Sequence, residues 1–433
     1  MSRAARRFEC GSVLCCLALA LAFRVHLDNS GDSSWTFQRN DEVHYLTLAT
    51  DFLNGRWRVT YFINPTFYAY VVWMVSSVMG WVGVVLGRFE SFADFRLQAT
   101  LDPWWLLMAA RVVAIASGVL AVGLLHLVGR RIGGPGVGIV AALALAVDAT
   151  HAERSMIGVN EAPMVLLVLA FLHFALAHVE RPTATKHALA GLFLGLAAST
   201  KYNAGIHIVT LAVATIAAKR DPRGDPLGGP LARLGQGIGF LVAPVAFLLG
   251  SPGVLREPGL FWSEFRTQSA YLSDGFLWRE KSWDVNGWWV YLARFPAENV
   301  GLAFSILCWL GLAWMAWRAV RWRDRAACVL LAGVMPTYLF LGSGTFLLMR
   351  FLLPAIPCAL LAGAWVLERA VRATLAHPLA RRALPRPLQA TSAPAVVGVL
   401  LALLLLCSHA RSTWNTLWVQ FGRTDRRAEA AAR

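Results

Sequence analysis

Long apolar stretches recur along this chain and alternate with shorter polar segments. Each stretch holds roughly 16–20 residues, close to the length that an α-helix needs to cross a bilayer. The pattern predicts an all-α polytopic membrane protein with about 11 transmembrane helices. We expect these helices at residues 11–27, 106–129, 135–150, 162–179, 187–201, 204–218, 234–250, 299–317, 327–343, 351–367 and 393–409.

A further apolar run, at residues 66–86, decides which side of the membrane each later loop faces. If it crosses the bilayer, all later loops change sides. If it lies at the surface or re-enters, the N-terminus and the arginine-rich loops such as 318–326 face the cytoplasm. Basic residues are then dense in short cytoplasmic loops, which is the usual orientation of membrane proteins. We therefore expect a juxtamembrane or re-entrant helix in the first outer loop.

The same pattern divides the chain into six segments. Residues 1–27 read as either a signal peptide or an uncleaved first span, and we favour the span because the polar segment after it needs an anchor. The expected segments are the N-terminus and first helix (1–27), a first extracytoplasmic loop (28–105), transmembrane helices (106–250) with an acidic loop (151–161) and a lysine hairpin (200–203), a second long outer loop (251–298), the last transmembrane helices (299–409) and an extracytoplasmic tail (410–433).

Composition excludes several classes of protein. The chain is 57% hydrophobic and only 15% charged, whereas a soluble domain is nearer a quarter charged. The chain has a net charge of +15, and its basic residues lie between the apolar runs, where they set the orientation in the membrane and contact lipid headgroups. We therefore expect membrane lipids and no nucleic acid as partners. The seven cysteines lie in or beside apolar runs, and no nucleotide-binding or zinc motif occurs. We expect neither a cofactor nor a metal.

Two carboxylates, Asp41 and Glu42, follow the first span and begin an amphipathic pattern typical of a helix on the membrane surface. One interpretation is structural, with Asp41 as an N-cap and Glu42 complementing the helix dipole. The other is that Asp41 is a general base that accepts a proton from an attacking hydroxyl or amine. Adjacent helical residues point about 100° apart, so only one of the two faces a given substrate.

Further charged residues stand at the outer ends of later spans. Arg154 and Glu161 lie in the second outer loop, where they either bind substrate or pair with charges of the first loop. Lys201 lies in a hairpin between two spans and Arg350 at the start of another. Each either anchors its helix at the interface or holds a phosphate.

Together these residues give one outer face with acids that accept a proton and cations that hold an anion. Transfer from a phosphorylated membrane lipid to an outside acceptor requires both, since the cations stabilise the charge that develops on the leaving phosphate. A transporter or lipid flippase is the main alternative, although the repeated halves and mid-membrane breaks of that class are not evident. A non-catalytic scaffold is a third, and it predicts that Asp41, Lys201 and Arg350 lie far apart.

Four short motifs resemble the GT-C glycosyltransferases, in particular the protein O-mannosyltransferases and the aminoarabinose-type family-39 enzymes. The motifs are NDEVHY at 40–45, NPTFYAY at 64–70, GLAASTKY at 195–202 and RFLLP at 350–354. In these families the acid pair is followed by a helix that stays on the outer side, which favours the same position for residues 66–86. The family's His-Pro-Pro is replaced here by residues 64–66, NPT.

The resemblance implies a role for each matching residue. Asp41 is the catalytic carboxylate, Lys201 and Arg350 engage a lipid phosphate, and Glu161 corresponds to the family's second-loop acid. Glu42, Arg154 and Tyr202 complete the expected substrate-binding set.

The implied activity is transfer of a sugar from a polyprenyl-phosphate-linked donor to an unknown extracytoplasmic acceptor, with inversion at the sugar carbon. The implied location is a bacterial inner membrane. Residues 423–428 resemble the opening of the family's outer C-terminal domain, which leaves open whether the C-terminus is complete.

Overall fold

The computed structural model describes residues 3–25, 40–219, 237–274, 287–345, 347–376, 395–407, 409–411 and 413. These residues form helices joined by turns and irregular segments, and no strand occurs among them. In chain order the helices are α1 (Arg3–Val25), α2 (Asn40–Leu53), α3 (Phe67–Val85), α4 (Phe92–Leu101), α5 (Trp104–Gly133), α6 (Pro135–Val147), α7 (Ala149–Met156), α8 (Glu161–Glu180), α9 (Ala184–Thr200), η2 (Tyr202–His207), α10 (Ile208–Lys219), α12 (Ile238–Gly250), α13 (Gly253–Arg256), α14 (Pro258–Asp274), α15 (Gly287–Phe295), η3 (Pro296–Val300), α16 (Gly301–Arg321), α17 (Arg325–Gly342), η4 (Met349–Leu352) and α18 (Ile356–Ala376).

The predicted all-α membrane architecture is confirmed. Six helical stretches of the described residues are long and apolar enough to cross a membrane, or seven if α6 and α7, which meet at a bend of 60°, form one span. Three shorter apolar helices, at Tyr202–Ala218, Ile238–Gly250 and Ala395–Cys407, coincide with further predicted spans. The total of about 11 spans stays a prediction, because the remaining helices are shorter or less apolar than a full crossing requires.

The core of the bundle forms around α6, whose residues Gly136 to Val147 are all buried. Helices α1, α5 and α18 pack around it, α8 packs on α5, and α9 joins α8 to α12. Helices α9 and α12 approach closely because small residues line their contact: a Cβ on Gly195 would lie 2.1 Å from the carbonyl oxygen of Ala243. Close packing of small residues is a common way for helices to associate in lipid.

The segment predicted as an acidic loop at 151–161 is helical over its first half. Helix α7 continues to Met156 after the bend that follows α6. Asp148 begins it by accepting a hydrogen bond from the backbone N–H of His151 at 2.8 Å, which is the usual action of an N-cap aspartate. Five of the eight residues of this helix are polar or charged, but most of its side chains are buried between neighbouring helices. Tertiary burial therefore stabilises a helix where the local sequence suggested a polar loop.

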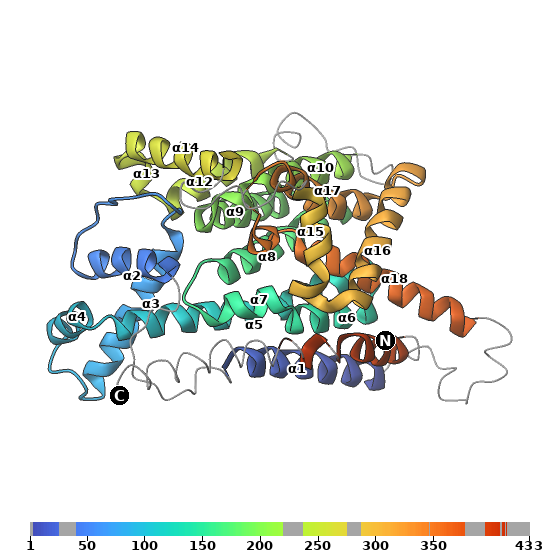
Figure 1. The fold of residues 1–433 in the computed structure, drawn as a ribbon, viewed down its shortest axis with the longest axis horizontal. Helices are drawn as coiled ribbons and strands as arrows, with labels where there is room; N and C mark the ends of the chain where they lie inside the picture. Colours follow the sequence, from blue (N-terminus) through green and yellow to red (C-terminus); the bar gives the residue numbers. More distant parts are fainter. Residues whose placement is uncertain are drawn as a thin grey trace.

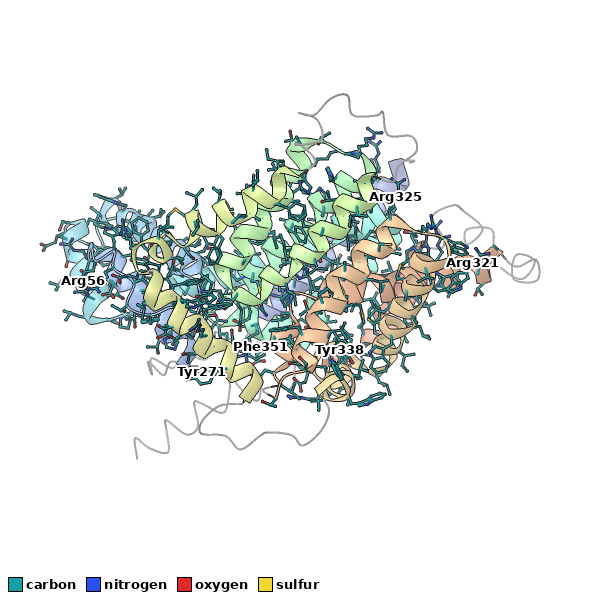
Figure 2. All side chains as sticks on the ribbon, turned by 90° about the horizontal axis from the view of Figure 1, so that it is seen from above. Arg56, Tyr271, Arg321, Arg325, Tyr338 and Phe351 are labelled. Atoms are coloured by element: carbon teal, nitrogen blue, oxygen red, sulfur yellow. The ribbon has the colours of Figure 1, made fainter. Side chains whose placement is uncertain are left out.

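The two ends of the molecule differ in character. In Figure 1 the N-terminus and the C-terminal half of α18 lie at one end of the long axis, and α2, α3, α4 and α13 lie at the other. Figure 2 shows Arg321 and Arg325 at the first end and Arg56 at the second. This arrangement has the segments expected in the cytoplasm at one end and those of the first outer loop at the other.

Helix α3, which covers the apolar run at 66–86, runs across the direction of the long helices α1 and α5 in Figure 1. It is also long and apolar enough to cross a membrane. Its expected position at the outer surface stays a prediction. Five longer stretches of the chain lie outside the described residues: the start of the first outer loop (26–39), residues 220–236, residues 275–286 of the second outer loop, residues 377–394 and most of the tail at 410–433.

Candidate functional site

A cavity of about 650 Å³ lies where α2, the start of α8, η2, α14 and η4 meet. Five of the residues expected to carry function line it: Asp41, Glu161, Lys201, Tyr202 and Arg350. They come from segments separated by hundreds of positions in the sequence. The separation that a non-catalytic scaffold predicts for Asp41, Lys201 and Arg350 is therefore wrong.

One ion pair in the cavity joins the first outer loop to the start of η4. A terminal nitrogen of Arg350, Nη1, donates to Oδ2 of Asp41 at 2.6 Å. The Asp41 side chain keeps 40% of its surface exposed and that of Arg350 keeps 21%. The carboxylate of Asp41 is thus held in the cavity while remaining open to a substrate. Its partner is Arg350, so the interpretation of Asp41 as a simple helix cap does not describe its contact.

A second ion pair joins α8 to the lysine hairpin. Lys201 Nζ donates to Oε1 of Glu161 at 2.7 Å, and their side chains are only 12% and 2% exposed. Lys201 also lies over the ring of Phe351, with Nζ 5.7 Å from the ring centroid. Because Glu161 is almost inaccessible, it is suited to orienting Lys201 and not to accepting a proton from a substrate. The carboxylates of Asp41 and Glu161 are therefore not equivalent.

The hairpin that carries Lys201 is fixed on three sides. Asn160 donates through its amide nitrogen to the carbonyl oxygen of Thr200 at 2.6 Å. Tyr202 donates its hydroxyl hydrogen to the carbonyl oxygen of Phe62 at 3.0 Å, and Asn203 donates to the carbonyl oxygen of Phe351 at 3.1 Å. These bonds connect the hairpin to α8, to the first outer loop and to η4. The ammonium group therefore has a defined position before any ligand binds.

Electrostatics at the two cations differ. Burial lowers the pKa of Lys201 below its usual value, and the carboxylate of Glu161 opposes that effect. Burial also acts to lower the pKa of Arg350, but Glu161 and Asp41 outweigh it and raise that pKa above its usual value. Arg350 accordingly remains a cation at all ordinary pH values. The charges within the two ion pairs cancel, because each pair joins one carboxylate to one cation.

Glu42 lies outside the cavity lining. It is fully buried, accepts a hydrogen bond from the backbone N–H of Gly158 at 2.8 Å and lies 3.5 Å from Nε of Arg111. These contacts join the first turn of α2 to α5 and to the segment after α7. As expected for adjacent helical residues, only one of the two acids, Asp41, faces the cavity. The position of Glu42 suits a residue that orients α2.

Arg154 also lies outside the cavity lining. Its side chain is buried on α7, and one terminal nitrogen lies 3.7 Å from a carboxylate oxygen of Glu153. Two other nitrogens of its guanidinium are buried without a hydrogen-bond partner among the described residues. Its charge is close enough to Glu161 to stabilise that carboxylate. Arg154 thus acts on the cavity through the field it adds, without contact with the space itself.

Sequence reasoning missed one wall of the cavity. Helix α14 contributes Glu264, Gln268 and Tyr271, which lie at the i, i+4 and i+7 positions of one helical face. Figure 2 labels Tyr271 on this helix and Phe351 on η4, two residues that line the cavity from different elements. The helical spacing of Glu264, Gln268 and Tyr271 was the available signal. Helix α14 thus gives the cavity a polar wall without cations, separate from the two ion pairs.

The chemistry of the lining suits an anionic group and a hydroxyl-rich one. Lys201 and Arg350 provide donors for a phosphate, and the wall of α14 provides donors and acceptors for hydroxyl groups. No group of three or more His, Cys, Asp or Glu side chains converges in the part of the chain that the structure describes. The expectation that the site needs no metal stays a prediction.

Comparison with known proteins identifies the fold. The chain has the GT-C fold of polytopic membrane glycosyltransferases, and the resemblance predicted from the motifs is confirmed. Residues 106–248 match the family described as dolichyl-phosphate-mannose-protein mannosyltransferase. This segment includes α7, the start of α8 and the lysine hairpin, and thus Arg154, Glu161, Lys201 and Tyr202. A search of curated proteins finds no match to this sequence.

Two solved structures share the fold over nearly the whole chain. The archaeal oligosaccharyltransferase AglB from Archaeoglobus fulgidus, in complex with an inhibitory peptide and a dolichol-phosphate, gives a TM-score of 0.65 at 12% identity over 96% of this chain. ArnT from Cupriavidus metallidurans, bound to undecaprenyl phosphate, gives a TM-score of 0.55 at 17% identity over 97% of this chain. The chain spans 56% of the length of AglB and 77% of that of ArnT.

Proposed function

We propose that this protein is a membrane glycosyltransferase that moves a sugar from a polyprenyl-phosphate-linked donor to an acceptor on the extracytoplasmic face of a bacterial inner membrane. The observation that carries the proposal is the cavity in which Asp41, Lys201 and Arg350 meet. The two structural relatives described above were solved with polyprenyl phosphates, dolichol-phosphate and undecaprenyl phosphate. Their shared fold supports a donor of the same chemical class.

The proposed reaction is a single displacement at the anomeric carbon. A hydroxyl or amine of the acceptor attacks that carbon, and its proton passes to the carboxylate of Asp41 as the new bond forms. The bond between the anomeric carbon and the phosphate oxygen breaks, and its electron pair leaves with the polyprenyl phosphate. Attack from the side opposite the leaving group inverts the anomeric configuration.

The two cations stabilise the departing phosphate. Lys201 supplies a compact positive charge and Arg350 a planar set of donors, of which Nε is buried without a partner among the described residues. Donors already oriented toward the developing charge need no rearrangement during the reaction, which is the main source of electrostatic catalysis. A phosphate that shares Arg350 with Asp41 also weakens the hold of that arginine on the carboxylate, and this leaves Asp41 a better base.

The exposed fractions of the two acids support Asp41 as the base. Asp41 keeps 40% of its side-chain surface exposed, whereas Glu161 keeps 2%. An acceptor reaches only the former. In this proposal Glu161 positions Lys201, Glu42 positions α2, and Tyr202 positions the hairpin.

The direct test is the Asp41→Asn substitution, assayed by transfer from a lipid-phosphate sugar donor in membranes. Loss of a general base costs roughly 10²–10⁴-fold in rate. Asp51→Asn on the same helix is the matched control, since Asp51 pairs at the surface with the exposed Arg56. We expect the control to retain activity. Transfer by the Asp41→Asn protein at the rate of the Asp51→Asn protein would refute the role of Asp41.

The polar face of α14 is proposed to contact the sugar or the acceptor. Gln268→Ala removes an amide from the middle of this face, and we expect it to raise KM for one of the two substrates while folding is unchanged. Ser263→Ala is the control, because Ser263 is exposed on the same helix and does not line the cavity. Equal KM values for both substrates in the Gln268→Ala and Ser263→Ala proteins would remove α14 from substrate recognition.

A further inference from the structure

A second cavity, also of about 650 Å³, lies between α16 and α18. Figure 2 shows Arg321, the last residue of α16, at the end of the molecule that also carries Arg325. Figure 1 shows the N-terminus at the same end of the long axis. The cavity therefore lies toward the end of the molecule away from α2 and α3, on the side that we expect to face the cytoplasm.

The lining of this cavity is graded along the two helices. Leu310 and Trp314 come from α16, one helical turn apart, and Arg318 follows one turn later. On α18, Trp365 and Val366 precede Arg369 by about one turn. Leu310, Trp314 and Val366 thus line the part nearer the middle of each helix, and the arginines lie nearer its end, where Trp322 and Ala370 complete the lining. This is the polarity of an amphiphile with an acyl chain and a charged head.

Both arginines are held against one aromatic ring. The guanidinium carbon of Arg318 lies 4.7 Å from the ring centroid of Trp365, and that of Arg369 lies 4.9 Å from it. Trp314 stacks on Trp365 with 6.4 Å between centroids. Cation–π contacts of this kind fix the direction of an arginine without neutralising its charge. Two guanidinium groups therefore lie on one ring that lines the cavity.

The carboxylates near this cavity leave one of its two arginines without an ion pair among the described residues. Arg318 pairs with Asp324, and Arg372 pairs with Glu368, but no ion pair involves Arg369 among the described residues. Nε of Arg318 is buried without a hydrogen-bond partner there. The sequence that follows α18, residues 377–394, holds three arginines and no acidic residue, so its own charge disfavours it as an occupant. The site calls for an anion supplied from outside the chain.

We infer that this cavity binds an anionic phospholipid of the inner leaflet, with the phosphate between Arg318 and Arg369 and an acyl chain along Leu310, Trp314 and Val366. Basic pockets between membrane helices on the cytoplasmic side bind anionic headgroups because the leaflet there is rich in them. The lipid links α16 to α18 at the end of the molecule that carries Arg321. The site is independent of the proposed transfer reaction.

The test is lipid binding to the purified full-length protein. The protein is stripped of lipid in a neutral detergent and titrated with phosphatidylglycerol or with phosphatidylcholine of identical acyl chains, and bound lipid is counted by native mass spectrometry. We expect phosphatidylglycerol to bind more tightly. Arg369→Gln is expected to lower that affinity roughly fivefold and to leave phosphatidylcholine binding unchanged. Arg321→Gln is the matched control, because Arg321 is exposed on α16 and does not line the cavity.

Three results would overturn the inference. Equal affinity of the wild-type protein for the two phospholipids would show that the site does not distinguish headgroup charge. An equal loss in the Arg321→Gln and Arg369→Gln proteins would assign the effect to general surface charge. Displacement of phosphatidylglycerol by an equal concentration of inorganic phosphate or of undecaprenyl phosphate would show a site for free phosphate or for the polyprenyl lipid. Trp365→Leu, which removes the ring under both guanidinium groups, is expected to weaken phosphatidylglycerol binding as well.

Discussion

Substitution of Lys201 tests whether its ammonium group serves the stability of the protein, catalysis or both. Lys201→Met leaves the carboxylate of Glu161 without its partner in a place where its side chain is 2% exposed. Breaking one side of a buried ion pair costs about 3–5 kcal/mol. The nearby charges of Arg154 and Arg350 continue to stabilise Glu161, so we expect the lower end of that range. Such a loss is a large fraction of the roughly 5–15 kcal/mol that keeps a protein folded.

The second variant, Lys201→Met combined with Glu161→Gln, removes both charges. Replacing both members of a buried ion pair with uncharged residues often changes the free energy of unfolding little, so we expect the double variant to unfold near the wild-type temperature. Its transfer activity should nevertheless remain low, because the cation that stabilises the leaving phosphate is still missing. Thermal unfolding in detergent and transfer from a lipid-phosphate sugar donor are measured on the same preparations.

Two outcomes would refute this reasoning. A Lys201→Met protein as stable as the wild type would show that the pair with Glu161 contributes little. A double variant that recovers both stability and transfer would show that Lys201 serves only as the partner of Glu161. A loss of activity in both variants with stability restored only in the second is the expected result.

Two further predictions concern the supports of the site. Glu42→Gln keeps the hydrogen-bond acceptor for the N–H of Gly158 but removes the charge that faces Arg111. We expect thermal unfolding to show a destabilisation of about 1–3 kcal/mol, with some transfer activity retained. Complete loss of transfer in a folded protein would contradict a purely positioning role. Gly195→Ala adds a Cβ 2.1 Å from the carbonyl oxygen of Ala243, which forces α9 and α12 apart at a cost of about 1–3 kcal/mol. Gly205→Ala is its control, because a Cβ there meets nothing closer than 3.8 Å, and equal stability of the two alanine proteins would contradict the packing argument.

Each cation of the ion-paired cavity has a carboxylate partner within the protein. Asp41 pairs with Arg350 and Glu161 pairs with Lys201, so these four groups together add no net charge to the cavity. A donor phosphate brings additional negative charge between two fixed cations. Arg350 is the group that both the phosphate and Asp41 contact in the proposed mechanism, and it therefore couples donor binding to the availability of the base.

The helical architecture and the positions of most helices could be predicted from the sequence. In lipid, a backbone finds no water to satisfy its N–H and C=O groups, so an apolar run of sufficient length forms a helix whatever its neighbours are. The run at 162–179 became α8 and that at 106–129 became part of α5. Charged residues at the ends of such runs, including Lys201 and Arg350, were therefore recognisable as interfacial before their contacts were known.

The contacts within the site were decided by tertiary structure alone. Asp41 and Arg350 are 309 positions apart, and no local pattern indicates that they pair at 2.6 Å. Helical geometry indicated only that one of the two acids Asp41 and Glu42 faces a substrate, whereas the packing of α2 against α5 turned Asp41 into the cavity and buried Glu42. Helix α7 formed where a loop was expected, because burial in the bundle outweighs the polar character of its eight residues.

The wall formed by α14 shows the same division. Its polar stripe was visible in the sequence at the i, i+4 and i+7 positions, but a stripe of this kind on a surface helix faces water as readily as a substrate. Only the arrangement of the whole chain brings Glu264 and Gln268 to the cavity that holds Lys201. The sequence by itself determined which segments are helices, since that depends on local hydrogen bonding and solvent. The tertiary structure decided which side chains meet, since that depends on the packing of segments far apart along the chain.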